Sequence, residues 1–246
     1  MAAIIMVMRT IMTMATITTT MLADAALHRL LAWTSPAYPV GSFTYSHGLE
    51  TAVEDGRVRT ATDVAAYVEA VLARGGGWVD AVLFVHAYET AGDAAAFDAI
   101  AELAGAFRGS SETALESRQQ GGSFLSVTRK AWPHPTLDAF AARWEGRPMA
   151  HTVVMALACA AHAIPLEPAL HGWLHATAAN LVSAGVRLVP LGQTDGQLAL
   201  AALSHAIPAI AAKAMITSLD DLGTAAPDLE LASLAHETLY TRLFRS

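Results

Sequence analysis

Apolar residues recur every three to four positions along most of this chain, and no useful length of it alternates with period two. The first spacing places apolar side chains on one face of a helix, whereas a half-buried strand needs the second. Alanine, a strong helix former, supplies much of the 54% hydrophobic content. The short β-branched stretch Val186 to Val189 is too isolated to build a sheet. The sequence therefore predicts an all-α, single-domain helical bundle of about eight to ten helices.

Capping residues, glycines and prolines set the expected helix boundaries. Asp24 is expected to cap a first helix that stops at Ser35-Pro36, and Ser42 to cap a second that runs to about Val53, with Gly56 as its left-handed C-cap. The other expected helices begin at the Thr60/Asp63 capping pair, at 78, at the Asp93 cap, at 110, at 136, at 151, at 167 and at Asp195. The helix from 110 is expected to be interrupted at Gly121-Gly122, and the one from 167 to end at Gly185. The last should have Thr194/Gln197 as a capping box and a kink or restart at Pro208.

The stretch from Ser35 to Glu50 interrupts this helical pattern. Pro36 and Pro39 fix the backbone dihedral φ and lack an amide donor, so the chain should run extended until Gly41 permits a sharp turn. Large aromatic and polar side chains crowd this connector, although aromatics are only 7% of the chain. It can be read as a packed elbow between helices or as a functional surface.

Charge and apolar runs restrict the partners and the compartment. Fifteen Lys and Arg against 22 Asp and Glu give a net charge of −7 with no basic patch, so nucleic acid is not an expected partner. The apolar runs 152–166 and 198–216 are short or broken by polar residues and proline, so no membrane span is expected. The single cysteine, Cys159, cannot form an internal disulfide, and the cytoplasm is the natural compartment.

The first twenty residues differ in composition from the rest. They hold five Met, six Thr, one Arg and no acid, which superficially resembles a targeting peptide. Because Arg9 lies inside the apolar run and Met21 is a plausible start, residues 1–20 are expected to be an extension, unstructured or not the native start. A short terminal helix is the alternative. Residues 21–246 then form the single domain, with 220–246 as a partner-binding tail.

No pattern indicates catalysis or a bound metal. His171 and His175 have the i, i+4 spacing of two zinc ligands, but the Glu of a metalloprotease motif is missing between them. The Gly75-Gly76-Gly77 run lacks the Lys-Ser or Lys-Thr of a phosphate loop. A Gly-x-Ser-x-Gly nucleophile motif is absent, and Cys159 has no charged neighbour to activate it. We expect no catalytic residue, cofactor or metal site, and no enzymatic activity.

Two polar segments remain open to two interpretations each. The loop Gly192 to Gln197 can be a simple helix N-terminus or a surface that receives a partner's backbone or an anion. After the acidic, turn-rich segment 220–227, Leu231, Leu234 and the later apolar residues form an amphipathic terminal segment. That segment can pack on the chain's own core, or it can offer Tyr240, Leu243 and Phe244 to another protein.

Four blocks together resemble the urease accessory protein UreF family, in the family's order and over Leu22 to Ser246. The blocks are Ser-Pro-Ala-Tyr-Pro-Val-Gly-Ser-Phe from Ser35 with Ser-His-Gly-Leu-Glu from Ser46, Glu-Ser-Arg-Gln-Gln-Gly from Glu116, Leu-Val-Pro-Leu-Gly-Gln-Thr-Asp-Gly-Gln from Leu188, and His-Glu-Thr-Leu-Tyr-Thr-Arg-Leu-Phe-Arg-Ser from His236. Val40, Thr44 and Ser117 are modest departures from the commoner choices.

The resemblance implies an all-helical, homodimeric, cytoplasmic chaperone. It implies that the chain binds the accessory subunit UreD, also called UreH, and recruits the GTPase UreG to apo-urease for nickel insertion, with a passage for the ion in the UreD/UreF complex. A metal-dependent hydrolase and a small-ligand-binding helical protein are the alternatives. The residues expected to bind partners are Tyr38, Phe43, Tyr45, His47, Glu50, Arg118, Gln193, Asp195, Gln197, His236, Glu237, Tyr240, Arg242, Leu243 and Phe244.

Overall fold

The computed structural model describes residues 23–246 and confirms the all-α prediction: this part of the chain has eleven α-helices and no strand. The count is slightly above the expected eight to ten. The extension predicted for residues 1–20 lies outside the described residues. The helices are α1 Asp24–Trp33, α2 Leu49–Glu54, α3 Ala61–Arg74, α4 Gly76–Glu89, α5 Ala94–Ala106, α6 Ser111–Ala131, α7 Pro135–Arg143, α8 His151–Ala161, α9 Leu166–Leu188, α10 Gln193–Ala214 and α11 Pro227–His236, with 3-10 turns η1 Ser42–Thr44 and η2 Leu219–Asp221.

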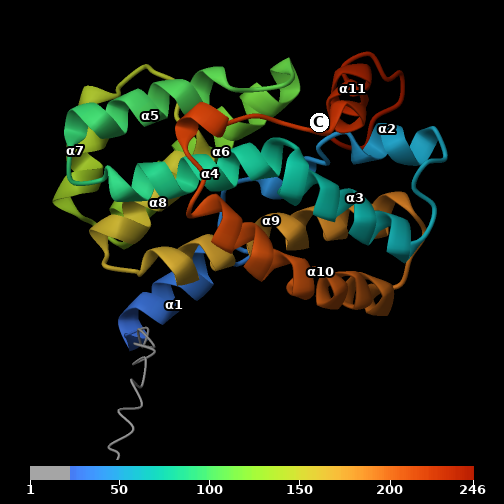
Figure 1. The fold of residues 1–246 in the computed structure, drawn as a ribbon, viewed down its shortest axis with the longest axis horizontal. Coiled ribbons are helices and arrows are strands. Elements are labelled where there is room, and N and C mark those ends of the chain that lie inside the picture. Colours follow the sequence, from blue (N-terminus) through green and yellow to red (C-terminus); the bar gives the residue numbers. More distant parts are fainter. Residues whose placement is uncertain (1–22) are drawn as a thin grey trace, which may run out of the picture.

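Helix α4 lies at the centre of the bundle. It packs on α3, α5, α8, α9 and α10, and nine of its fourteen residues are buried, as expected of a helix surrounded by others. Helices α5 to α8 form one side of the molecule, while α3, α9 and α10 form the other (Figure 1). The short α11 lies against α2, so the last part of the chain returns to the segment after α1.

Several predicted boundaries are confirmed by their capping interactions. Thr60 and Asp63 form a capping box at the start of α3, and the Asp93 side chain accepts hydrogen bonds from two amides in the first turn of α5. Gly56 has a φ of 72° after α2, as its predicted C-cap role requires. The predicted cap at Asp24 is wrong, because Asp24 is the first residue of α1 and no side chain caps that helix.

The helix predicted from Ser42 to about Val53 is present only in its second half, as α2. Its start is wrong, because the chain makes the 3-10 turn η1 and a loop before α2 begins at Leu49: His47 and Gly48 have φ values of 53° and 76°, which a right-handed helix cannot include. Its predicted end near Val53 agrees with the end of α2 at Glu54. A Cβ atom on Gly48 would lie 2.7 Å from the amide nitrogen of Ser233, so this glycine also allows α11 to approach closely.

Gly121, expected to interrupt a helix, and Gly185, expected to end one, both lie inside continuous helices. Gly121 belongs to α6, where a Cβ atom would clash with the carbonyl oxygen of Met149, and Gly185 belongs to α9, where it would lie 2.6 Å from a methyl group of Val64. Glycine lowers helix propensity by only about 1 kcal/mol relative to alanine. Close packing between helices outweighs that penalty, and the predicted interruptions are therefore wrong.

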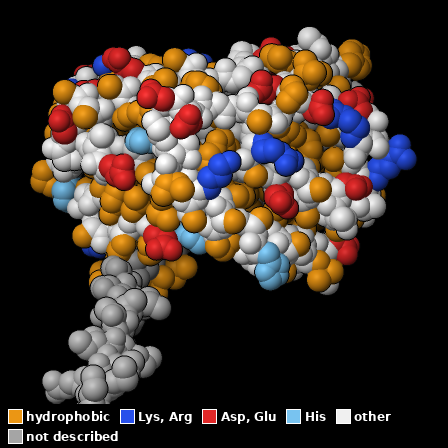
Figure 2. Space-filling view, viewed as in Figure 1, with side chains coloured by type: hydrophobic (Ala, Val, Ile, Leu, Met, Phe, Trp, Pro, Cys, Tyr) orange, Lys and Arg blue, Asp and Glu red, His pale blue; other side chains and the backbone are white. Residues whose placement is uncertain are grey.

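Helix α10 also differs from the prediction. It begins at Gln193, and the Asp195 Oδ2 atom accepts the Gly192 amide at 2.9 Å, so the Thr194/Gln197 capping box is wrong. The helix continues through Pro208 without a restart. Of the described helices, α10 alone has the length and apolar content of a membrane span, yet it packs against α3, α4 and α9. On the face shown in Figure 2, acidic and basic side chains are interspersed.

Candidate functional site

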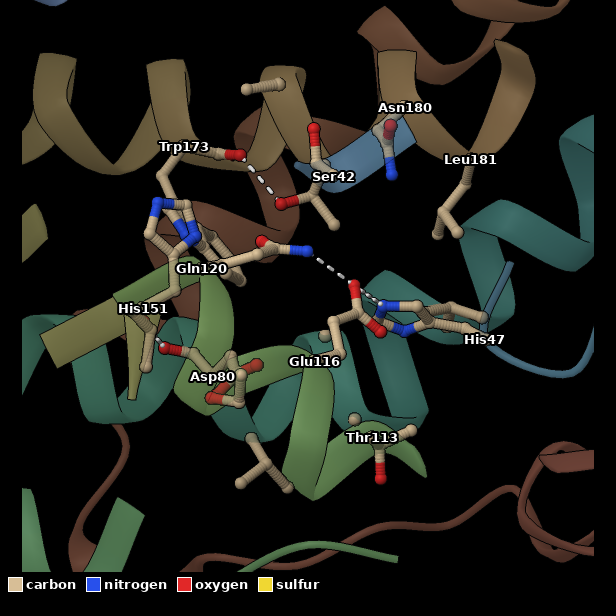
Figure 3. Close-up of a pocket in the computed structure, with 18 of the residues that line it drawn as sticks. Ser42, His47, Asp80, Thr113, Glu116, Gln120, His151, Trp173, Asn180 and Leu181 are labelled. Atoms are coloured by element: carbon tan, nitrogen blue, oxygen red, sulfur yellow. Dashed lines mark hydrogen bonds and ion pairs between the residues drawn. The ribbon is translucent and has the colours of Figure 1, made fainter. Parts of the chain in front are cut away.

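A cavity of about 550 Å³ lies between α4, α6, α8, α9 and the connector that follows α1. Apolar side chains such as Met155 and Leu181 line part of its wall, and polar side chains gather on the rest (Figure 3). The volume falls within the usual range for preformed small-molecule sites, which is about 300 to 1,000 Å³.

Glu116 on α6 is the centre of the first polar cluster. Its Oε1 atom lies 3.1 Å from His47 Nε2 and accepts a hydrogen bond of 2.8 Å from Gln120, and its Oε2 atom accepts one of 3.2 Å from the Ser246 hydroxyl. Burial lowers the pKa of His47, but the charge and hydrogen bond of Glu116 outweigh burial and raise the pKa overall. The contact therefore favours an ion pair between His47 and Glu116.

A second pair of charges lies farther along the cavity, on the side of His151 (Figure 3). Arg108 and Asp80 approach to 2.9 Å, and both side chains are largely buried. Burial lowers the pKa of His151 to about 4, so this imidazole is neutral near pH 7. Its Nε2 atom has no hydrogen-bond partner within the described part of the chain. No group of three or more His, Cys, Asp or Glu among residues 23–246 is arranged to hold a metal ion.

Beside the cavity, four ionisable side chains form what we call the tail clamp: Glu50, Glu112, His236 and Arg242. The fully buried His236 ring lies 2.6 Å from Glu112 through Nδ1 and 3.0 Å from Glu50 through Nε2, while Arg242 donates to Glu112 at 2.6 Å.

The segment Glu237–Ser246, which we call the tail, is irregular after α11 and is bound to the body by its backbone. Glu50 accepts the amides of Leu243 and Phe244 at 2.6 and 2.9 Å, and the Thr44 carbonyl accepts the Arg245 amide at 2.7 Å. Phe244 is only 4% exposed. The tail is therefore buried at Phe244 and Ser246, while most of its other residues remain at the surface.

Arg187, near the end of α9, joins the tail to the connector. Its guanidinium group lies 3.5 Å from the ring centroid of Phe43 and 4.4 Å from that of Phe244, and it donates to the Phe43 carbonyl at 2.9 Å. Sequence reasoning missed Arg187, Glu112, Glu116 and Gln120. Arg187 directly precedes one of the four blocks, and Glu116 and Gln120 lie within another, but nothing in their spacing indicated a contact.

Three of the four blocks meet at this place. Tyr45 donates a hydrogen bond of 2.6 Å to Gln119, and Glu237 accepts two from Ser111. The contacts described above add His47, Glu50, His236, Arg242 and Phe244. Tyr38 packs elsewhere, with its hydroxyl 2.8 Å from that of Thr128. Arg118 is exposed, and Gln193, Asp195 and Gln197 lie apart, at the start of α10.

Exposure divides the predicted partner-binding residues into two groups. Tyr45, Glu50, His236 and Phe244 are buried by contacts within the chain, so the structure gives them an internal place. Phe43, Leu243 and Tyr240 are 58%, 65% and 102% exposed. Large apolar side chains at the surface are the kind that protein interfaces use, and for these three a partner contact stays a prediction.

The fold and the site define an all-helical protein whose polar groups hold its own segments together around a cavity. The UreF family model matches residues 58–204. A urease accessory protein UreF from Granulibacter bethesdensis is 52% identical over 225 residues, which cover 91% of this chain and 95% of that protein. One from Rhodopseudomonas palustris strain TIE-1 is 49% identical over 91% of this chain and 93% of its own length. The chain belongs to the UreF family of urease accessory proteins.

Proposed function

We propose that this chain is a non-catalytic accessory subunit of urease maturation, which binds a UreD-type (UreH-type) partner and recruits the GTPase UreG to apo-urease for nickel insertion. Family membership over most of the chain supports the proposal. The observation that carries it is the tail, whose backbone is fixed by Glu50 while Tyr240 and Leu243 stay at the surface. An ordered segment loses little conformational freedom on binding, which favours affinity.

The exposed side chains of Phe43, Tyr240 and Leu243 are the proposed contacts with the UreD-type partner. Truncation of an anchoring aromatic at the centre of an interface costs about 1 to 4 kcal/mol of binding free energy. A pull-down with the partner should therefore fail for the Tyr240→Ala/Leu243→Ala double variant. Leu231→Ala is the matched control, since this leucine on α11 is also well exposed but is not one of these three. Equal capture of both variants would contradict the proposal.

The start of α10 is proposed as a separate contact, for UreG or apo-urease. Gln193 and Gln197 are exposed there, away from the tail, and Arg118 on α6 is exposed as well. If the surfaces are separate, Gln193→Ala/Gln197→Ala should keep the UreD-type partner in the pull-down and lose urease activation in a reconstituted assay. Loss of the UreD-type partner itself would contradict this assignment.

The cavity is proposed as this chain's share of the nickel passage in the complex. Imidazole and carboxylate groups, which bind divalent nickel as cargo, line it through His47, His151, Asp80 and Glu116. Urease reconstituted with a Met155→Trp variant, which fills the cavity, should contain less nickel at equal partner binding. Unchanged nickel content would refute the passage.

The cavity also supports a second candidate, a small-ligand-binding protein, because its volume suits a small molecule. A rise in melting temperature with an added metabolite would favour that candidate.

We further propose a cytoplasmic homodimer. Light scattering on the purified protein tests the dimer, and a mass equal to one chain would contradict it.

A further inference from the structure

His47 has an unusual backbone conformation for a residue with a side chain. Its φ is 53°, and that of the next residue, Gly48, is 76°, so two successive residues of the connector are left-handed. Glycine adopts this region readily, whereas an L-residue such as His47 is disfavoured there by the contacts of its Cβ atom. The conformation of His47 therefore needs support from the residues around it.

Tyr67 on α3 supplies a dedicated contact to this turn. Its hydroxyl donates a hydrogen bond of 2.8 Å to the carbonyl oxygen of His47. Within the described part of the chain, no other group donates to that oxygen. Only 8% of Tyr67 is exposed, and burial raises the pKa of its hydroxyl, so the donor proton is retained.

The direction of the His47 side chain depends on this backbone conformation. Its ring points into the cavity and faces Glu116, with Nε2 3.1 Å from Oε1 (Figure 3). Because the backbone dihedrals of a residue set the direction of its side chain, a different φ at His47 would turn the imidazole away from α6. Tyr67 does not line the cavity. Any effect of its hydroxyl on the ring therefore passes through the backbone of His47.

We propose that Tyr67 is a positioning residue, whose hydroxyl holds the left-handed turn at His47 and thereby keeps the imidazole opposite Glu116 in the cavity. The consequence for nickel delivery rests on the proposed function, because it matters only if the cavity is the passage. The position of the ring is a property of the isolated chain and can be measured without nickel or partners.

Tyr67→Phe tests the proposal, because it removes the hydroxyl and keeps the buried ring. Tyr88→Phe is the matched control. Tyr88, on α4, also donates its hydroxyl to a backbone carbonyl at 2.8 Å, that of Ile164, and it does not line the cavity. Both variants lose one oxygen atom and the same kind of hydrogen bond, so a purely structural role of these hydroxyls predicts the same result for both.

The first measurement is the nuclear Overhauser cross-peak between the His47 ring and the side-chain amide of Gln120 in the isolated protein. The Nε2 atoms of both residues contact Glu116 Oε1, at 3.1 and 2.8 Å, so their protons lie close together. The His47→Gln variant identifies the ring signal. In Tyr67→Phe the cross-peak should weaken at least about twofold, because loss of a hydrogen bond shifts a conformational equilibrium several-fold. In Tyr88→Phe it should match the parent.

Circular dichroism checks that both variants keep the helical content of the parent. An unchanged cross-peak in folded Tyr67→Phe would overturn the positioning role, and so would an equal loss in Tyr88→Phe.

The second measurement is the nickel content of urease reconstituted with each variant, at equal capture of the UreD-type partner. Tyr67→Phe should lower it, and Tyr88→Phe should not. The two measurements separate the positioning role from the proposed function. A weakened cross-peak with unchanged nickel content would support the positioning role and contradict the passage, whereas an unchanged cross-peak contradicts the positioning role whatever the nickel content.

Discussion

Phe244 and Tyr240 lie four residues apart in the tail, and the structure predicts opposite effects for their truncation. Phe244 is 4% exposed and packs under Arg187, whereas Tyr240 is 102% exposed. Replacing a buried Phe by Ala costs about 3 to 5 kcal/mol, and loss of the cation–π contact adds about 0.5 to 1 kcal/mol. For a domain of this size the sum corresponds to a fall in melting temperature of roughly 7 to 24 °C. Tyr240→Ala should change the unfolding free energy by less than about 0.5 kcal/mol.

Urea denaturation of the two single variants checks this prediction, with pull-down of the UreD-type partner on the same samples. Tyr240→Ala should reduce capture by at least about tenfold, which is roughly 1.4 kcal/mol, at unchanged stability. If both variants lose the same stability, or if Phe244→Ala unfolds at the same urea concentration as the parent, the placement of the tail is wrong.

Four further predictions concern other parts of the chain. Burial lowers the pKa of His151 to about 4, so below pH 6.5 the unfolded chain binds a proton that the folded chain does not. The contribution of His151 to the unfolding free energy should therefore be complete above pH 6.5 and fall by about 3 kcal/mol toward pH 4. In the His151→Gln variant, the midpoint of urea denaturation should depend less on pH over that range. Gly121→Ala should destabilise by about 1 to 3 kcal/mol through its clash with Met149, whereas Gly122→Ala, whose Cβ would meet nothing, should not lower the melting temperature. Deletion of residues 1–20 should leave the melting temperature and urease maturation unchanged, and a loss of several degrees would contradict the extension. The isolated protein should neither release phosphate from GTP nor retain nickel in equilibrium dialysis at submicromolar free metal.

The parts of the fold that were predictable depend on local chemistry. Thr60 with Asp63, and Asp93, cap helices through amides within three residues, so the sequence alone identifies them. Gly121 and Gly185 misled the prediction because the atoms they must accommodate belong to Met149 and to Val64, which the sequence does not place. Glycine alone does not distinguish a helix end from a close helix contact.

The candidate site was predictable only in part for the same reason. His47, Glu50 and Phe244 stood out because they belong to unusual blocks, but their partners are distant in the chain: His236 lies 186 residues after Glu50, and Glu116 lies 69 residues after His47. Hydrophobic periodicity shows which face of a helix is buried. It does not show which carboxylate meets which imidazole.

The contact between Glu50 and the tail also affects the order in which the protein can fold. Glu50 leaves the ribosome 193 residues before Leu243 and 194 residues before Phe244. Contacts between residues so far apart form late, because closing a long loop is entropically unfavourable. Throughout synthesis the anchoring carboxylate of Glu50 must therefore stay hydrated, and the newly made helices can assemble before the tail that closes over them exists.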